Sequence, residues 1–155
     1  MKHFHVALLA IVCIALANPH GEAAPQSERS DEAAIRRVLD DYIGLYRGDA
    51  LTRWKALFLP GFVASYTNAD DSVRSRTLDE FYASQKAGFD SGAMSETLHG
   101  VRIERVGRLA HVFADFRFTS RGSERPGQLM LLMIEERGQL KIAALTFTYH
   151  LAPAR

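Results

Sequence analysis

The chain has 155 residues, of which 47% are hydrophobic and 24% are charged, and 19 Lys and Arg side chains nearly balance 18 Asp and Glu side chains. This is the profile of one globular domain, and the length leaves little room for a second. The formal net charge of +1 gives no strongly basic surface, so we expect no nucleic-acid partner.

The N-terminal segment has the pattern of an export signal. A short basic start precedes an unbroken apolar run from Val6 to Ala17, which ends on small residues. The run is shorter than the about 20 apolar residues that span a bilayer. We predict a signal peptide at residues 1–23, cleaved after Ala17 or Ala23, and a secreted or periplasmic protein that has no membrane segment once the leader is removed.

Cleavage also removes Cys13, the single cysteine, so the mature chain is expected to have no disulfide, thiolate nucleophile or cysteine-based zinc site. Residues 24–30 are expected to form a flexible linker, and residues 31–151 are expected to form the domain.

Three helices are predicted in the first half of the domain. From Asp31 onward apolar residues recur at three- and four-residue steps until Gly48 ends the helix. A second helix is expected over residues 49–60, where Pro60 ends it. The third begins with a capping box at residues 77–80 and ends near Gly92.

Five strands are predicted in the remainder. Beyond residue 95 the hydrophobic period changes from 3.6 to 2, and short turns separate the runs, which is typical of antiparallel hairpins. The polar stretch 69–76 is predicted to be a loop. The predicted strands are 62–68, 97–106, 109–119, 128–135 and 140–150. Helices followed by strands predict the α+β class, with the helices on one side of the sheet.

Three segments carry a resemblance to a known superfamily. They are the Glu32-x-x-Ile35-x-x-Val38-Leu39-x-x-Tyr42 helix, the Gly48-Asp49 break leading to Trp54 and Leu57-Phe58, and the closing hairpin of residues 136–142. Taken with the order of elements, they resemble the nuclear transport factor 2-like superfamily, in its SnoaL-like and lumazine-binding-like group, over about residues 31 to 150. Relatives often carry a Trp in the closing hairpin where this chain has Leu140.

The resemblance implies a cone-shaped, cystatin-like α+β fold in which three helices pack on a curved, mainly antiparallel sheet. It implies no single activity, because this fold hosts enzymes, binding modules and dimerisation domains.

The cone is expected to hold an aromatic pocket. Tyr and Trp side chains carry a polar atom that needs a partner when buried, so they suit the orientation of a ligand better than Phe does. The expected ligand-binding residues are Tyr42, Tyr46, Trp54, Tyr66 and Tyr149.

His99 is the candidate catalytic residue. It alternates in phase with Val101 and Ile103, which predicts that its ring points into the mouth of the cone as a general acid or base. The alternative is a partly exposed histidine at the start of a strand. Arg74 and Arg76 present a similar choice, between clamping an anionic ligand at the rim and simple solvation in a loop.

The sequence predicts no metal site and no cofactor. The histidines are far apart, and no glycine-rich phosphate loop precedes a helix.

One face of strand 109–119 mixes apolar and charged side chains. They include His111, Phe113, Asp115 and Arg117. In this fold such a face commonly packs against a second subunit, so we predict a homodimer through it.

These features favour a secreted domain that binds a small apolar ligand in its cone, with no assured catalysis. A first alternative is a SnoaL-like, cofactor-free isomerase, cyclase or hydrolase that uses His99 and a pocket tyrosine. A second alternative is a dimeric interaction module. A buried ionisable group in the cone would favour the enzyme, a dry aromatic pocket the binding protein, and a filled cone the interaction module.

Overall fold

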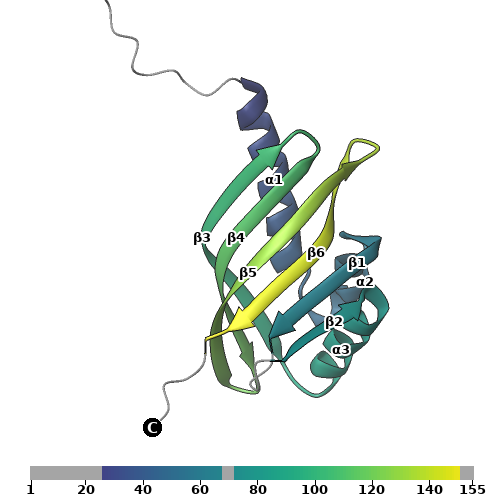
Figure 1. The fold of residues 1–155 in the computed structure, drawn as a ribbon. Coiled ribbons are helices and arrows are strands. Elements are labelled where there is room, and N and C mark those ends of the chain that lie inside the picture. The colour runs from purple at the N-terminus through teal and green to yellow at the C-terminus, as the bar shows by residue number, and fades with distance from the viewer. Residues whose placement is uncertain (1–25, 68–71, 151–155) are drawn as a thin grey trace, which may run out of the picture.

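The computed structural model describes residues 26–67 and 72–150 (Figure 1). Its helical elements are α1 (Gln26–Gly44), the 3-10 turn η1 (Gly48–Ala50), α2 (Leu51–Lys55) and α3 (Leu78–Asp90). α1 begins within the stretch predicted as a linker, because no glycine or proline interrupts the polar residues that follow Pro25. The predicted capping box of α3 is confirmed: the Glu80 carboxylate accepts from the Thr77 N–H at 2.8 Å, and the Thr77 hydroxyl accepts from the Glu80 N–H.

The strands form one six-stranded sheet in the order β2-β1-β6-β5-β4-β3. Their bounds are β1 (Phe58–Thr67), β2 (Val73–Thr77), β3 (Met94–Val106), β4 (Leu109–Ser120), β5 (Ser123–Glu136) and β6 (Gln139–Tyr149). Only β1 and β6 run parallel; the other neighbours are antiparallel. The α+β class and the mainly antiparallel sheet are therefore confirmed.

The three helices lie on one face of the sheet (Figure 1). α1 packs across β3 and β6, and α3 packs against β1 and β2. No helix of the described residues covers the other face, which we call the outer face.

The second helix is shorter than predicted, because β1 already begins at Phe58. The side chains of Phe58 and Phe62 are both buried, and Phe58 pairs with Ile142 of β6. The pairing register shifts just after Phe58, which accommodates Pro60, a residue that cannot donate to a strand ladder.

The sixth strand, β2, forms where the sequence predicts a loop. Its residues Val73–Thr77 are almost entirely exposed and show no apolar alternation. Pairing with β1, from Val63 opposite Thr77 to Thr67 opposite Val73, holds them in an extended conformation. A tertiary contact, not a local pattern, therefore makes this edge strand.

Trp54 is the centre of the core between α1, α2 and the sheet. It is 0% exposed, and its ring lies 4.6 Å from the ring of Phe58, 5.3 Å from Tyr46 and 5.6 Å from Tyr42. These contacts fix the aromatic side chains of α1 that continue toward the cavity described below.

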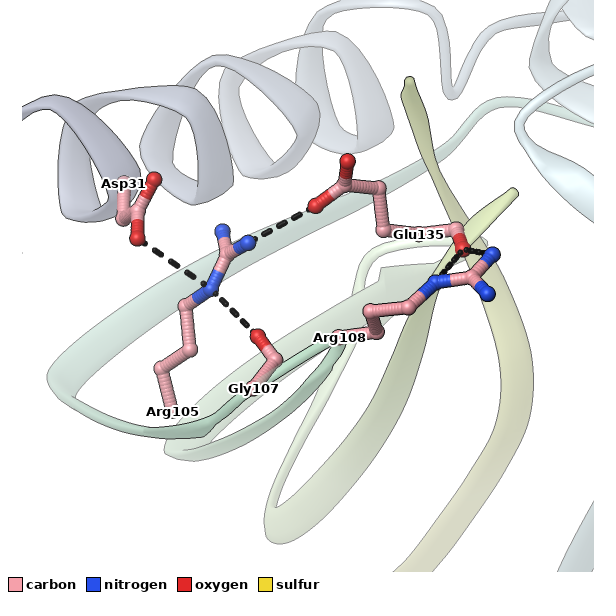
Figure 2. A network of polar contacts seen from close by, with 5 residues as sticks. All are labelled: Asp31, Arg105, Gly107, Arg108 and Glu135. Carbon is pink, nitrogen blue, oxygen red and sulfur yellow. Dashed lines mark hydrogen bonds and ion pairs between the residues drawn. The ribbon is translucent and has the colours of Figure 1, made fainter. Parts of the chain in front are cut away.

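Arg105 joins three elements at the end of the sheet where β3 turns into β4 (Figure 2). Its guanidinium lies 2.8 Å from the Glu135 carboxylate of β5 and 3.4 Å from the Asp31 carboxylate of α1. The Arg108 guanidinium donates to the Glu135 carbonyl. Because the Arg105 side chain is only 20% exposed, water screens its ion pairs less than it screens a surface pair. The pair with Asp31 fixes α1 against the hairpin, and the pair with Glu135 joins β3 to β5.

Candidate functional site

A cavity of about 400 Å³ lies between α1, α3 and the helix-covered face of the sheet, and every strand contributes to its lining. Aromatic and aliphatic side chains make up just over half of its lining, and Ser, Gln, Glu and Arg side chains make up most of the rest. Cavities of this size and character hold small molecules in other proteins.

Glu96 is the acidic side chain that lines this cavity. It lies on β3 opposite Phe118 of β4, and Leu98 lies opposite Phe116. Residues directly opposite on antiparallel strands share a face of the sheet, and both phenylalanines are buried under the helices. Glu96 therefore points inward.

A β-bulge in the middle of β3 makes this orientation compatible with the rest of the strand. His99 lies opposite Asp115 and Arg102 lies opposite Phe113, so β3 has one residue more than β4 between the two pairs. Gly100 within the bulge has a φ of +59°, which side-chain-bearing residues rarely adopt. Beyond the bulge Ile103 lies opposite the buried Val112, so both halves of β3 contribute inward side chains.

The Glu96 carboxyl is removed from water. Its Oε1 is buried and has no hydrogen-bond partner among the described residues, although the residue as a whole keeps some exposed surface. Burial disfavours the charged form and raises the pKa of Glu96 from its usual value of 4.5 to about 7, and the adjacent Tyr42 hydroxyl opposes the rise. Both protonation states are thus available near neutral pH, as a general acid or base requires.

Tyr42 and Tyr46 present hydroxyl groups from α1 to the same cavity. Burial raises the pKa of each hydroxyl well above its ordinary range, and the Glu96 carboxyl adds to the rise, so both stay protonated. The Tyr46 hydroxyl donates to the Gln85 side-chain carbonyl of α3, which holds its ring in place. Tyr42 is the hydroxyl next to Glu96 that stays neutral and able to donate.

Tyr66 and Tyr149 form part of the aromatic wall. The Tyr66 ring stacks on Phe147 with 5.1 Å between centroids, and Tyr149 meets Phe116 edge to face at 5.4 Å. Four of the five aromatic side chains predicted to bind a ligand therefore line the cavity, and their binding of one stays a prediction.

Trp54 does not line the cavity. It lies in the core behind Tyr42 and Tyr46, where its bulk supports their rings from the far side. Its Nε1 has no hydrogen-bond partner among the described residues.

The predicted placement of His99 in the cone is wrong. Its side chain is exposed, and it shares the outer face with Asp115, outside the cavity lining. Its Nε2 lies 3.1 Å from the Thr97 hydroxyl. The alternation with Val101 and Ile103 is real in the sequence, but the bulge reverses the facing between His99 and Val101.

Glu96 is not among the site residues that the periodicity of the sequence predicts. The signal that points to it is Gly100, since an isolated glycine inside a strand pattern is typical of a bulge. A phase change at Gly100 places Met94, Glu96 and Leu98 on the inward face, ahead of Val101 and Ile103.

Three arginines line the mouth of the cavity: Arg76 of β2, Arg121 of the β4–β5 turn and Arg125 of β5. Arg76 lies over the Tyr66 ring at 5.2 Å, and Arg125 lies over the Tyr149 ring at 4.5 Å. Arg74, predicted beside Arg76, is exposed on β2 and is not part of the lining.

The residues predicted at a dimer interface lie on the outer face of β4. His111, Asp115 and Arg117 are exposed there, and Phe113 is half-buried. Arg117 forms a cross-strand ion pair with Glu124 at 2.6 Å, and Asp115 accepts from the Gln128 amide at 3.1 Å. The homodimer itself stays a prediction.

The predicted signal peptide, residues 1–23, lies outside the described residues, so export stays a prediction from the sequence. Within residues 26–67 and 72–150, no helix is long and apolar enough to cross a membrane. Over the same residues, no group of three or more His, Cys, Asp or Glu side chains is arranged to hold a metal ion.

Solved structures share this architecture. A nuclear transport factor 2-like protein of unknown function from Shewanella baltica is 14% identical, with a TM-score of 0.63 over 80% of this chain and 97% of that one. A candidate scytalone dehydratase from Novosphingobium aromaticivorans is 17% identical, with a TM-score of 0.67 over 81% and 87%. A candidate dehydratase of the same fold from Streptomyces avermitilis is 14% identical, with a TM-score of 0.67 over 81% and 99%.

The chain thus has the nuclear transport factor 2-like, cystatin-like fold that its sequence resembles. No protein-family model and no curated protein matches the sequence.

The raised pKa of Glu96 has a consequence for stability. In the unfolded chain the carboxyl ionises near its usual 4.5, and in the folded chain near 7. Below pH 4.5 it is neutral in both states and its contribution to stability is fully present. As the pH rises from 4.5 to 7, the unfolded state loses the proton first, and the free energy of unfolding falls by about 1.4 kcal/mol per unit of pKa difference until the folded state has ionised as well.

Glu96→Gln, which mimics the neutral carboxyl, should therefore gain about 2–3 kcal/mol of stability relative to wild type between pH 5 and pH 8. Urea denaturation followed by circular dichroism at both pH values measures the gain. Glu104→Gln, on an exposed part of the same strand, is the control and should show no such gain. An equal pH dependence in wild type and Glu96→Gln would contradict the buried, raised-pKa carboxyl.

Proposed function

We propose that this chain, exported as its first 23 residues predict, binds a small, largely apolar molecule in its cone and transfers a proton on that molecule through Glu96. The observation that carries the proposal is the Glu96 carboxyl itself. A buried Oε1 without a hydrogen-bond partner is unfavourable in a protein that needs the cavity only as an apolar pocket. It is useful where a ligand supplies the missing partner.

The chemistry follows from the neighbours of Glu96. As a carboxylate it removes a proton from a carbon next to a ligand carbonyl, and the C–H electron pair moves toward the carbonyl oxygen. The neutral Tyr42 hydroxyl interacts with the Glu96 carboxylate before the reaction. As Glu96 takes up the proton and loses its charge, that hydroxyl becomes free to donate a hydrogen bond to the negative charge that develops on the ligand oxygen. Protonated Glu96 then returns the proton in one of two ways. Where the ligand has a C=C next to the enolate, the proton goes to the far carbon of that double bond, which shifts the double bond and gives an isomer. Where the ligand has a hydroxyl on the second carbon from the carbonyl, the proton goes to that hydroxyl, its C–O bond breaks as the enolate electron pair forms a new C=C, and water departs.

Loss of water is among these reactions because two structural neighbours are described as candidate dehydratases. Their identity to this chain is 17% and 14%, so they support the class of reaction without indicating a substrate. Neither reaction needs a cofactor, since a positioned acid–base group and a hydrogen-bond donor supply both steps.

The sequence favours a binding protein without catalysis, and the cavity suits that function too. The Glu96 carboxyl favours the enzyme, because a buried ionisable group in the cone is the feature that distinguishes an enzyme from a binding protein. The open volume of about 400 Å³ disfavours an interaction module with a filled cone.

Proton exchange into a bound ketone separates enzyme from binding protein. 2-Tetralone, a bicyclic ketone with exchangeable protons beside its carbonyl, is incubated with the protein in D₂O and followed by proton NMR. We expect exchange faster than in buffer alone, rising with pH through an apparent pKa of about 7. Glu96→Gln should slow the catalysed exchange by about 100-fold or more.

His99→Ala is the matched control and should leave the exchange rate unchanged, because His99 lies outside the cavity. If 2-tetralone binds but its protons exchange no faster than in buffer alone, the result would contradict catalysis and support a binding function only. Exchange that persists in Glu96→Gln would remove Glu96 from the mechanism.

We also propose that a second copy of this chain covers the outer face of β4. Leu109 is 43% exposed there, and the half-buried Phe113 lies beside Met130 of β5, so the face is partly apolar and bears no helix among the described residues.

Light scattering should give about twice the monomer mass. Phe113→Asp should give a monomer, and Ala83→Asp on exposed α3 should not. A wild-type monomer at high micromolar concentration would overturn the dimer.

A further inference from the structure

The side chains at the mouth of the cavity carry positive charge. Arg76, Arg121 and Arg125 come from three different elements of the fold and converge on the lining that also contains Glu96. Arg121 reaches it from the two-residue turn of the β4–β5 hairpin, and its side-chain stem lies beside Gly92, just after α3, where an added Cβ would come within 3.7 Å of the Arg121 Cγ.

These arginines have no acidic partner within ion-pair distance among the described residues, whereas other cations of the chain do. Arg105 pairs with two carboxylates and Arg117 pairs with Glu124. The hydrogen bonds from the Thr77 N–H and hydroxyl lower the pKa of the Glu80 carboxyl most, and the nearby Arg76 charge adds to this effect without an ion pair between the two.

Aromatic stacking orients two of the three guanidinium groups. Arg76 lies over Tyr66, and Arg125 lies over both Tyr149 and Phe118 at 4.5 and 5.2 Å. A guanidinium held over a ring face still has N–H groups that do not meet the ring and can donate to a ligand. A free planar edge matches the two oxygens of a carboxylate.

The distance between Glu96 and the arginines indicates how long the ligand is. Glu96, Phe118 and Arg125 occupy adjacent positions on β3, β4 and β5. Two interstrand steps separate the first from the last, or about 10 Å between backbones. A molecule that spans this distance over the Phe118 ring has one or two planar rings.

We propose, resting on the proposed function, that the molecule taken into the cone is an organic anion: a planar apolar body whose carboxylate lies among Arg76, Arg121 and Arg125 while its other end reaches Glu96. The exposed mouth leaves the carboxylate partly hydrated, so its transfer from water is not prohibitive. The apolar body replaces water along the aromatic wall, which supplies the driving force for binding.

The test compares two probes of the same shape, 2-naphthoate and the neutral 2-naphthamide, by isothermal titration calorimetry with the full-length mature protein at about pH 7. We expect 2-naphthoate to bind about tenfold more tightly, since a hydrogen bond to a charged group is stronger than a neutral one. That preference should shrink as salt is added. Arg125→Gln and, separately, Arg121→Gln should each reduce it severalfold with little effect on 2-naphthamide.

Arg102→Gln is the matched control. Arg102 also lies over an aromatic ring, Phe113 at 5.8 Å, but on the outer face and away from the cavity. It should leave both affinities unchanged, and circular dichroism checks that each variant folds.

Equal affinities for the two probes would overturn the proposal that the ligand is an organic anion and would leave the proposed function intact. If neither probe binds, both the proposal of an anionic ligand and the proposal of an apolar binding site are overturned. A loss of preference in Arg102→Gln equal to that in Arg125→Gln would show a general charge effect and would also overturn the assignment.

Discussion

The bulge at residues 99–102 of β3 is the constraint on which the cavity depends. A strand alternates strictly, so a regular β3 with Ile103 inward would place Glu96 on the outer face. The extra residue reverses the phase, and Gly100, at a φ of +59°, accepts the backbone conformation that this requires. One irregularity thereby sends an ionisable group into the cone without removing aliphatic side chains from the core.

The two halves of β3 consequently serve different purposes. Beyond the bulge, Ile103 packs in the core and Arg105 fixes the start of α1 through Asp31 and Glu135. Before the bulge, Glu96 faces Tyr42, which α1 presents from its opposite end. The Arg105–Asp31 ion pair that holds α1 to the hairpin thus helps to hold Tyr42 near the Glu96 carboxyl, since Asp31 and Tyr42 belong to one helix.

Sequence patterns predict those helices and strands of this fold that are determined by short-range interactions. The capping box at Thr77 begins α3, and the alternation of β4 gives the correct buried face. β2 was missed because its polar residues become a strand only by pairing with β1. The pattern also predicts the tyrosines of the cavity. A strict alternation that continues across Gly100 without a change of phase does not predict an inward Glu96 and places His99 on the wrong face.

The most direct test of this account is the titration of Glu96 itself. Carbon-13 NMR of side-chain carboxyl groups follows each Glu as a function of pH, and the signal absent from Glu96→Gln assigns the one of interest. We expect a midpoint of about 7 for this carboxyl. A midpoint near 4.5 would place it in water and contradict both the inward orientation set by the bulge and the proton transfer built on it.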